Sequence, residues 1–149
     1  IIEITINVFI NLQFEEFIFY KNLYSQPQTK PTGFGGGIGL NIFSTNQLQE
    51  CKLEFKNCIF SSNSVNQKEG SNDYNSGGSL YYVNDDNITL SELSINACNF
   101  TKNYAKQKGG SLYIKTGNKS PIFIKNCCFI LNKAEIDCGA VYIKNEAEF

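Results

Sequence analysis

Apolar and polar residues alternate along much of this chain in short runs, as at Leu53-Glu54-Phe55 and Leu93-Ser94-Ile95. A period of two residues is typical of a β-strand whose alternate side chains face a core. A further short run follows a pair of small residues, as at Leu80-Tyr81-Tyr82. The pattern therefore predicts three short strands in each of several similar segments, joined by turns and not by helices.

Two motifs recur four times and divide these runs into repeats. The first ends in asparagine, and its copies are Phe17-x-Phe19-x-x-Asn22, Cys58-x-Phe60-x-x-Asn63, Cys98-x-Phe100-x-x-Asn103 and Cys127-x-Phe129-x-x-Asn132. The second joins glycines to an aliphatic residue, in the copies Gly35-Gly36-Gly37-Ile38, Gly77-Gly78-Ser79-Leu80, Gly109-Gly110-Ser111-Leu112 and Cys138-Gly139-Ala140-Val141. The first motif begins at 17, 58, 98 and 127, which gives steps of 41, 40 and 29 residues. These repeats predict an all-β solenoid, a parallel β-helix of about four coils forming a single domain over residues 1–149.

Each repeated residue has an expected place in a coil. The second aromatic residue of the first motif is expected to stack from coil to coil, in a core ladder of Phe19, Phe60, Phe100 and Phe129. The asparagines are expected at corners with positive φ, where their amides also hydrogen-bond between coils, and the glycines at another corner. By alternation, the aliphatic residue after the glycines faces the core. This leaves an exposed aromatic row of Tyr81, Tyr113 and Tyr142.

Together, the Phe-x-x-Asn and Gly-Gly-small-aliphatic motifs resemble those of the polymorphic outer-membrane-protein repeat family, and similar repeats occur in large surface proteins of protists. The resemblance spans roughly residues 12–143. It implies a right-handed parallel β-helix and display on a cell surface as an adhesin. The chain departs from the family pattern at Cys138, which replaces the first glycine of the last repeat, and nothing in it resembles the membrane barrel that anchors bacterial members.

Composition narrows the classes of function. The chain has 149 residues, of which 42% are hydrophobic, and a net charge of −1. This charge gives no bias toward nucleic acid, and no stretch is apolar enough to predict direct insertion into a membrane. The absence of an initiator Met and of a signal peptide indicates a processed chain or a fragment of a longer one.

The six cysteines fall into two groups. Three share the first position of the first motif: Cys58, Cys98 and Cys127. Three lie outside that register: Cys51, Cys128 and Cys138. The first group is interpreted as a ladder of small core residues, whereas the even total allows disulfides in a surface protein. No metal site is expected, because no Cys-x-x-Cys spacing and no histidine is available for zinc.

Three sequons point to the outside of the cell. Asn87-Ile88-Thr89, Asn99-Phe100-Thr101 and Asn118-Lys119-Ser120 fit the acceptor pattern for N-linked glycans. Asn99 lies between two inward residues, so its side chain is expected to face outward. The sequence therefore predicts an extracellular or cell-surface glycoprotein.

An enzyme is not expected. Some parallel β-helices cleave polysaccharides, which leaves a lyase or hydrolase as a third hypothesis by analogy of fold alone. The pair Asp85-Asp86 fits a turn better than a catalytic pair. His and Trp are absent, and all positive charges come from Lys, so the usual bases and sugar platforms are missing. No catalytic residue and no cofactor is predicted.

The pattern of residues 1–14 favours assembly of several copies of the chain. Apolar residues alternate from Ile2 to Phe14, and the predicted assembly strand comprises Ile2, Ile4, Ile6, Val8 and Ile10. Such a strand over residues 1–14 is longer than one coil face, so it is expected to be donated to a neighbouring subunit or to end a preceding coil. The leading hypothesis is a non-enzymatic structural protein whose coils stack into a homopolymeric fibre or surface array, or onto further coils of a longer parent. The alternative is an adhesin module that binds a glycan or a protein.

Overall fold

The computed structural model describes residues 2–6, 10–24, 36–42, 50–66, 75–84, 90–116 and 120–145. Within these ranges the chain forms strands β1 to β17 and no helix. Every pairing between these strands is parallel. The expected all-β class with parallel strands is therefore confirmed.

The strands form four sheets, named A to D. Sheet A consists of β1 (Ile2–Ile6), β5 (Ile38–Ile42), β9 (Leu80–Asn84), β13 (Leu112–Thr116) and β17 (Val141–Asn145). Sheet B consists of β2 (Ile10–Glu15), β6 (Glu50–Lys56), β10 (Leu90–Asn96) and β14 (Ile122–Lys125). Sheet C consists of β3 (Ile18–Tyr20), β7 (Ile59–Ser61), β11 (Asn99–Thr101) and β15 (Cys128–Ile130). Sheet D consists of β4 (Leu23–Tyr24), β8 (Ser64–Val65), β12 (Tyr104–Ala105) and β16 (Lys133–Ala134).

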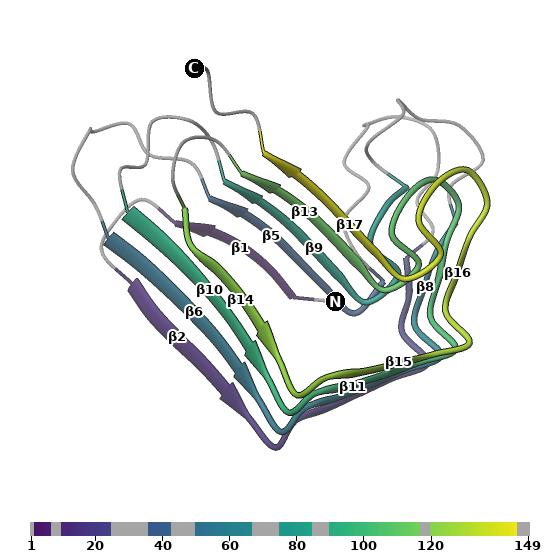
Figure 1. Cartoon of the computed structure of the whole chain (residues 1–149), viewed down its shortest axis with the longest axis horizontal. Helices are drawn as coiled ribbons and strands as arrows, with labels where there is room; N and C mark the ends of the chain where they lie inside the picture. The colour runs from purple at the N-terminus through teal and green to yellow at the C-terminus, as the bar shows by residue number, and fades with distance from the viewer. Residues whose placement is uncertain are drawn as a thin grey trace.

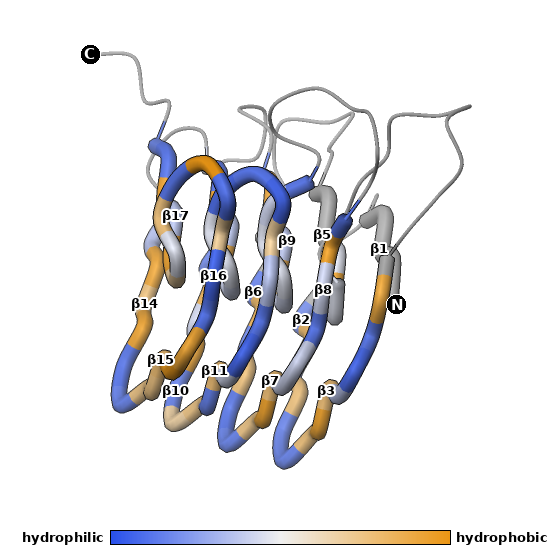
Figure 2. The backbone as a smooth tube through the Cα atoms, turned by 90° about the vertical axis from the view of Figure 1, so that its right-hand side faces the viewer, coloured by the Kyte–Doolittle hydropathy of each residue, from blue (hydrophilic) through white to orange (hydrophobic). Residues whose placement is uncertain are grey.

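Each sequence repeat contributes one strand to each sheet, in the order B, C, D, A (Figure 1). We call these sets layers: layer one is β2 to β5, layer two β6 to β9, layer three β10 to β13 and layer four β14 to β17. Figure 2 shows the layers side by side, with β1 at one end and β14 and β17 at the other. Residues at the same motif position lie opposite one another in neighbouring layers. Phe100, for example, lies opposite Phe60 of layer two and Phe129 of layer four.

The corners between sheets require left-handed backbone. Between sheets B and C the residues with positive φ are Glu16, Asn57, Ala97 and Asn126, and between sheets C and D they are Lys21, Ser62, Lys102 and Leu131. The expectation of positive φ at the motif asparagines is therefore wrong, because the turn falls on the residue before each of them. The preceding residue turns, and the asparagine side chain is left free to bond to the neighbouring layers.

The two glycines of the second motif have different tasks. The first adopts positive φ, with 68° at Gly77 and 62° at Gly109, which an L side chain rarely adopts. The second lies against the next layer, since a Cβ at Gly36 would be only 2.5 Å from the carbonyl oxygen of Gly78. In layer four the first motif position is Cys138, which has φ 53°. A non-glycine residue thus adopts the left-handed conformation that glycine adopts at this position in layers two and three.

The main core lies between sheets A, B and C. One stack of phenylalanine rings passes through all layers, with centroid separations of 4.7 Å for Phe19–Phe60 and 4.8 Å for both Phe60–Phe100 and Phe100–Phe129. The rings are within 11° of parallel. Leu53, Phe55 and their counterparts from other layers complete the same cluster. Burial of such side chains is the main favourable term, at about 1.5–3 kcal/mol each.

A ladder of asparagine amides runs beside the phenylalanine stack. Asn103 Oδ1 accepts from Asn63 N (3.0 Å) and Asn63 Nδ2 (3.1 Å). Asn103 Nδ2 in turn donates to the Phe60 carbonyl oxygen of layer two (2.9 Å) and to Asn132 Oδ1 of layer four (3.0 Å). Asn63 and Asn103 are buried, so these bonds satisfy groups that would otherwise be costly to bury. The coil-to-coil amide bonds expected from the sequence are present.

Asn103→Asp tests this ladder without a change of size. Aspartate keeps the acceptor but loses both donated hydrogen bonds, and at neutral pH it places a charge at a buried position. We expect urea unfolding near pH 7 to show a loss of about 2–4 kcal/mol. Burial raises the pKa of such a carboxyl above its unfolded value, so the loss should shrink as the pH falls toward about 4.

Asn99→Asp is the matched control, because Asn99 lies in the same layer as Asn103 and is exposed. Its effect should stay within about 0.5 kcal/mol. Equal losses for the two variants would show that the buried amide has no special role.

Candidate functional site

The two end faces of the stack differ from its middle. Inward residues of the inner layers are buried, as Leu53 and Leu93 are in sheet B. Their counterparts in the end layers, Leu12 and Ile122, are only partly buried. The side chains are of the same kind and occupy the same register, so the missing neighbouring layer accounts for the difference. Within the described residues, both end faces therefore present partly buried apolar side chains from strands that end their sheets.

The first residues do not form the single long strand expected from their alternation. β1 lies in sheet A and pairs with β5, in the register Ile2↔Ile38 to Ile6↔Ile42. Ile10 belongs to β2 in sheet B, where it faces Cys51, and Val8 lies outside the described residues. The two strands belong to different sheets, although the alternation of apolar residues in the sequence continues from one to the next. The expectation of one strand from Ile2 to Phe14 is therefore wrong.

The tyrosine row is not exposed as expected. Tyr81 is 5% exposed, Tyr113 is completely buried and Tyr142, in the last layer, is partly buried. Their rings stack at 5.0 Å (Tyr81–Tyr113) and 5.3 Å (Tyr113–Tyr142). The Lys108 ammonium also lies 4.9 Å from the centroid of the Tyr142 ring. The row is thus a second aromatic stack and offers no open binding platform.

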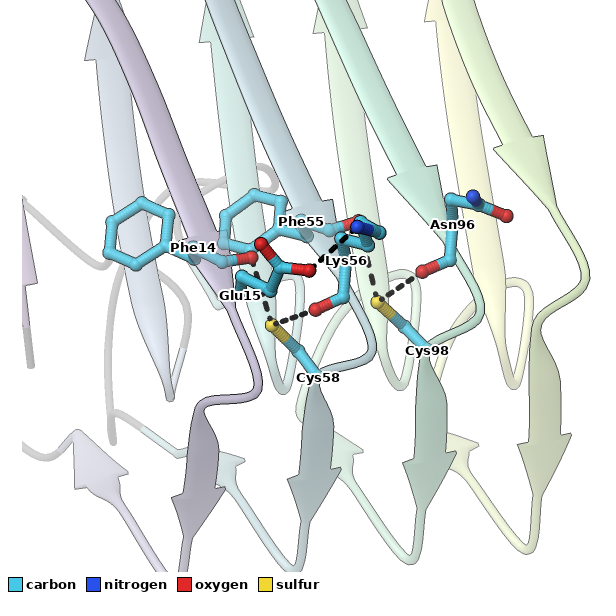
Figure 3. Close-up of polar contacts among 7 residues, drawn as sticks. All are labelled: Phe14, Glu15, Phe55, Lys56, Cys58, Asn96 and Cys98. Atoms are coloured by element: carbon cyan, nitrogen blue, oxygen red, sulfur yellow. Dashed lines mark hydrogen bonds and ion pairs between the residues drawn. The ribbon is translucent and has the colours of Figure 1, made fainter.

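Three cysteine thiols form a ladder at the corner between sheets B and C. Each Sγ lies near two carbonyl oxygens, one in its own layer and one in the layer before. Figure 3 shows this arrangement for Cys58 and Cys98. Cys58 Sγ is 3.4 Å from the oxygen of Lys56 and 3.3 Å from that of Phe14. Cys127 Sγ has equivalent partners, at 3.1 Å in its own layer and 3.6 Å in layer three. Cys58 and Cys98 are buried, which fits a core ladder.

Cys98 and Cys127 interact as a pair. A hydrogen bond from the Cys98 thiol stabilises the Cys127 thiolate and lowers the pKa of Cys127 to about 6. The same contact and the burial of its own thiol raise the pKa of Cys98 far above the ordinary value. The partly exposed Cys127 is thus the thiol of this pair that ionises first.

The remaining cysteines show no disulfide in the part of the chain that is described. Cys58, Cys98, Cys127, Cys128 and Cys138 all carry free thiols. Cys128 and Cys138 are exposed. Cys138 Sγ donates to Asp137 Oδ1 at 3.2 Å, which raises the pKa of its thiol. The side chain of Cys51 is outside what the structure describes.

One of the three sequons lies in described structure. Asn99 is the first residue of β11 and is exposed, between the buried Cys98 and Phe100. Asn87 and Asn118 lie outside the described residues, as does the pair Asp85-Asp86. Asn99 is thus placed on the outer side of sheet C, where a glycan would extend away from the core.

Ion pairs between layers were not expected from the sequence. On the outer side of sheet B, Lys52 Nζ lies 3.0 Å from Glu92 Oε1, and Lys56 Nζ lies 2.6 Å from Glu15 Oε1. The hydrogen bonds to these glutamates raise the pKa of both lysines. The partners are about forty residues apart in sequence, so only the register of the sheet brings them together. Exposed pairs of this kind favour correct register more than stability.

Within the described ranges no three His, Cys, Asp or Glu side chains gather closely enough to hold a metal ion. No helix long and apolar enough to cross a membrane occurs in the same part of the chain. No family model matches the chain, and comparisons with curated proteins and with solved structures gave no match.

The thiol pair predicts an unusual pH dependence for Cys127. Because the thiolate is the nucleophile, alkylation by iodoacetamide should already be near its maximal rate at pH 7 and fall to half near pH about 6. Peptide mass spectrometry in a Cys128→Ser background measures the rate at Cys127 alone. In Cys98→Ala the half-maximal pH should rise toward the ordinary value of 9.0. A half-maximal pH near 9 with Cys98 present would refute the pairing.

Proposed function

We propose that the four sheets are faces of a right-handed parallel β-helix of about four coils, and that the protein is a non-enzymatic structural subunit. Further coils of the same kind, supplied by a second copy, continue the helix at its ends and build a fibre or surface array. The order of strands supports the fold, since each repeat visits sheets B, C, D and A in turn. We assign a right-handed sense to the helix because crossovers between parallel strands are strongly preferred to be right-handed.

The observation that carries this function is the contrast within layer one. Ile38, in sheet A, is completely buried, and β1 pairs beside it on the end side. Leu12 and Phe14, in sheet B of the same layer, have no strand beyond them in the described residues and are only partly buried. One additional strand is thus enough to complete the burial of Ile38 in sheet A. An added coil would do the same for sheets B and C, and each side chain that completes its burial contributes on the order of 1 kcal/mol.

The polarity of the asparagine ladder supports stacking in one direction. In the layers where the bond is formed, the motif asparagine donates its backbone N–H and its Nδ2 to Oδ1 of the following layer. At the layer-four face the N–H of Asn132 points to where a following amide oxygen would lie. At the layer-one face Asn22 carries the matching Oδ1. The two faces are therefore complementary to each other and not to themselves, which favours head-to-tail polymers over closed dimers.

The extracellular setting is part of the proposal. It is supported by the exposed sequon at Asn99 and by the resemblance of the motifs to repeats of cell-surface proteins.

A surface adhesin module is the second candidate. Four apolar side chains of layer one are more than half exposed: Phe17, Ile18, Tyr20 and Leu23. Phe17 directly precedes β3, Ile18 and Tyr20 lie in β3, and Leu23 lies in β4 of the same layer. Aromatic side chains of this kind bind sugars and peptides. This cluster, and not the tyrosine row of sheet A, is the surface on which a ligand would be sought.

Self-assembly is tested by sedimentation and negative-stain electron microscopy over a range of protein concentrations. We expect filaments whose fraction rises steeply with concentration. Ile124→Lys should abolish them, because residue 124 faces inward at the layer-four face, where a lysine remains hydrated in the monomer and would be buried in the polymer. Circular dichroism should show that the variant keeps its β-structure.

Phe123→Lys is the matched control, since Phe123 precedes Ile124 in β14 but points outward and is 40% exposed. This variant should still polymerise. A protein that stays monomeric at every concentration would contradict the structural role, and glycan or peptide binding by such a monomer would support the adhesin.

A further inference from the structure

Two neighbouring layers place cysteine thiols side by side at the corner between sheets B and C. Cys98 of layer three and Cys127 of layer four occupy the same position of the first motif. The strand pairs β10–β14 and β11–β15 fix their register before and after this corner. The N–H of Cys128 also donates to the carbonyl oxygen of Cys98 at 3.0 Å. The two cysteines are therefore one strand spacing apart, with about 4.8 Å between their Cα atoms.

The sulfur atoms of this pair are in contact. The Cys98 thiol donates a hydrogen bond to the Cys127 sulfur. Each Sγ also lies near the carbonyl oxygen two residues before it, at 3.3 Å for Cys98 and 3.1 Å for Cys127, so the two side chains point the same way. A Cα separation of about 4.8 Å lies within the range that a disulfide spans, about 4.4–6.8 Å. The backbone thus already has a spacing at which the two thiols can be joined.

We propose that Cys98 and Cys127 form a thiol–disulfide exchange site, which reacts with a low-molecular-weight disulfide such as oxidised glutathione and closes an interlayer disulfide. The Cys127 thiolate attacks one sulfur of the incoming disulfide, which gives a mixed disulfide and releases one thiolate. Cys98 gives its proton to that thiolate and attacks the Cys127 sulfur, which releases the second thiolate. The two cysteines lose two electrons in total, and the incoming disulfide is reduced to two thiols. This site belongs to the single folded chain and does not depend on polymers.

The two thiols differ in the way that such a reaction requires. Cys127 is partly exposed within the described residues, and the contact with Cys98 lowers its pKa to about 6, so it is mostly thiolate at neutral pH. Cys98 is completely buried and its pKa is raised. Formation of the mixed disulfide removes the neighbouring negative charge that opposes ionisation of Cys98. Cys127 is therefore the attacking thiol and Cys98 the resolving thiol.

Cys58 provides the comparison within the same ladder. It occupies the same motif position in layer two and lies one strand spacing from Cys98 on the other side. Cys58 and Cys98 are only 1% and 0% exposed, so neither is the first to meet an external disulfide. The exchange site is therefore assigned to the pair that has one accessible thiol.

The parallel register also predicts that the link is easily reduced. In-register residues of neighbouring parallel strands keep their Cβ atoms about one strand spacing apart, about 4.8 Å, whereas disulfides prefer about 3.5–4.5 Å. A disulfide under such strain is more readily reduced than an ordinary structural disulfide. The link would thus join layers three and four reversibly, as long as the surroundings are oxidising.

Reaction of the folded chain with oxidised glutathione tests the site. The experiment uses the Cys128→Ser background, samples are quenched with acid over time, and peptide mass spectrometry maps each modified thiol. We expect glutathione to appear on Cys127 first and then to be replaced by a link between Cys98 and Cys127. Cys138 is the internal control, because it is exposed and any glutathione that it acquires should persist.

Cys98→Ser removes the resolving thiol at nearly constant volume. In this variant the mixed disulfide at Cys127 should persist at least about tenfold longer than in the chain that keeps Cys98. Cys58→Ser is the matched control, since it makes the same change at the same motif position in layer two. There the link between Cys98 and Cys127 should form at an unchanged rate. Circular dichroism checks that both variants keep their β-structure.

Two results in the chain that keeps both thiols would overturn the proposal: a Cys127 that stays unmodified, and a mixed disulfide at Cys127 that is never resolved. A dominant link between Cys58 and Cys98 would also overturn it, because the assigned pair would be wrong. Addition of reduced glutathione should restore both thiols. A link that resists this reductant would contradict the reversible bond.

Discussion

The side-chain amide of one repeated asparagine fixes the spacing, the register and the direction of the stack. A buried amide needs partners for its oxygen and for both hydrogens. Here the oxygen accepts from the asparagine of the layer before, and the two hydrogens are donated to a carbonyl of the layer before and to the asparagine of the layer after. These bonds form only when layers are one strand spacing apart and equivalent residues face one another. The stacked phenylalanine rings beside the ladder have the same requirement. The rest of the fold is arranged to keep this register, with left-handed corners before each asparagine and glycine where layers approach closely.

The same constraint explains why the ends are important. Every amide-to-amide bond of the ladder is donated to the following layer, so the ladder has two unlike ends and the proposed growth is directional. Inward residues are buried in the middle of the stack and partly exposed at its ends, although they are of the same kind. In the proposed assembly, each added copy extends the ladder in the same direction and completes the burial of these residues.

Strand formation and pairing could be predicted because the repeated motifs carry both the alternation and the register. Phe60 and Phe100 occupy the same motif position and are therefore opposite in the sheet. The burial of Tyr113 could not be predicted, since alternation assigns a side of the strand and does not reveal what covers that side. The continuous alternation from Ile2 to Phe14 does not reveal that β1 and β2 belong to different sheets, because both strands have the same period. The pair Lys52–Glu92 becomes visible only after the register is known, as does the contact between Cys98 and Cys127.

Native-state hydrogen exchange tests the directional ladder most directly. In the monomer, the backbone amide of Asn103 should exchange slowly, because its N–H donates to Asn132 Oδ1 at 3.0 Å. The amide of Asn132, at the same motif position, should exchange much faster, because no described layer follows it. In filaments the amide of Asn132 should slow to the rate of Asn103. Equal rates for the two amides in the monomer, or an unchanged fast rate for Asn132 in filaments, would contradict the account.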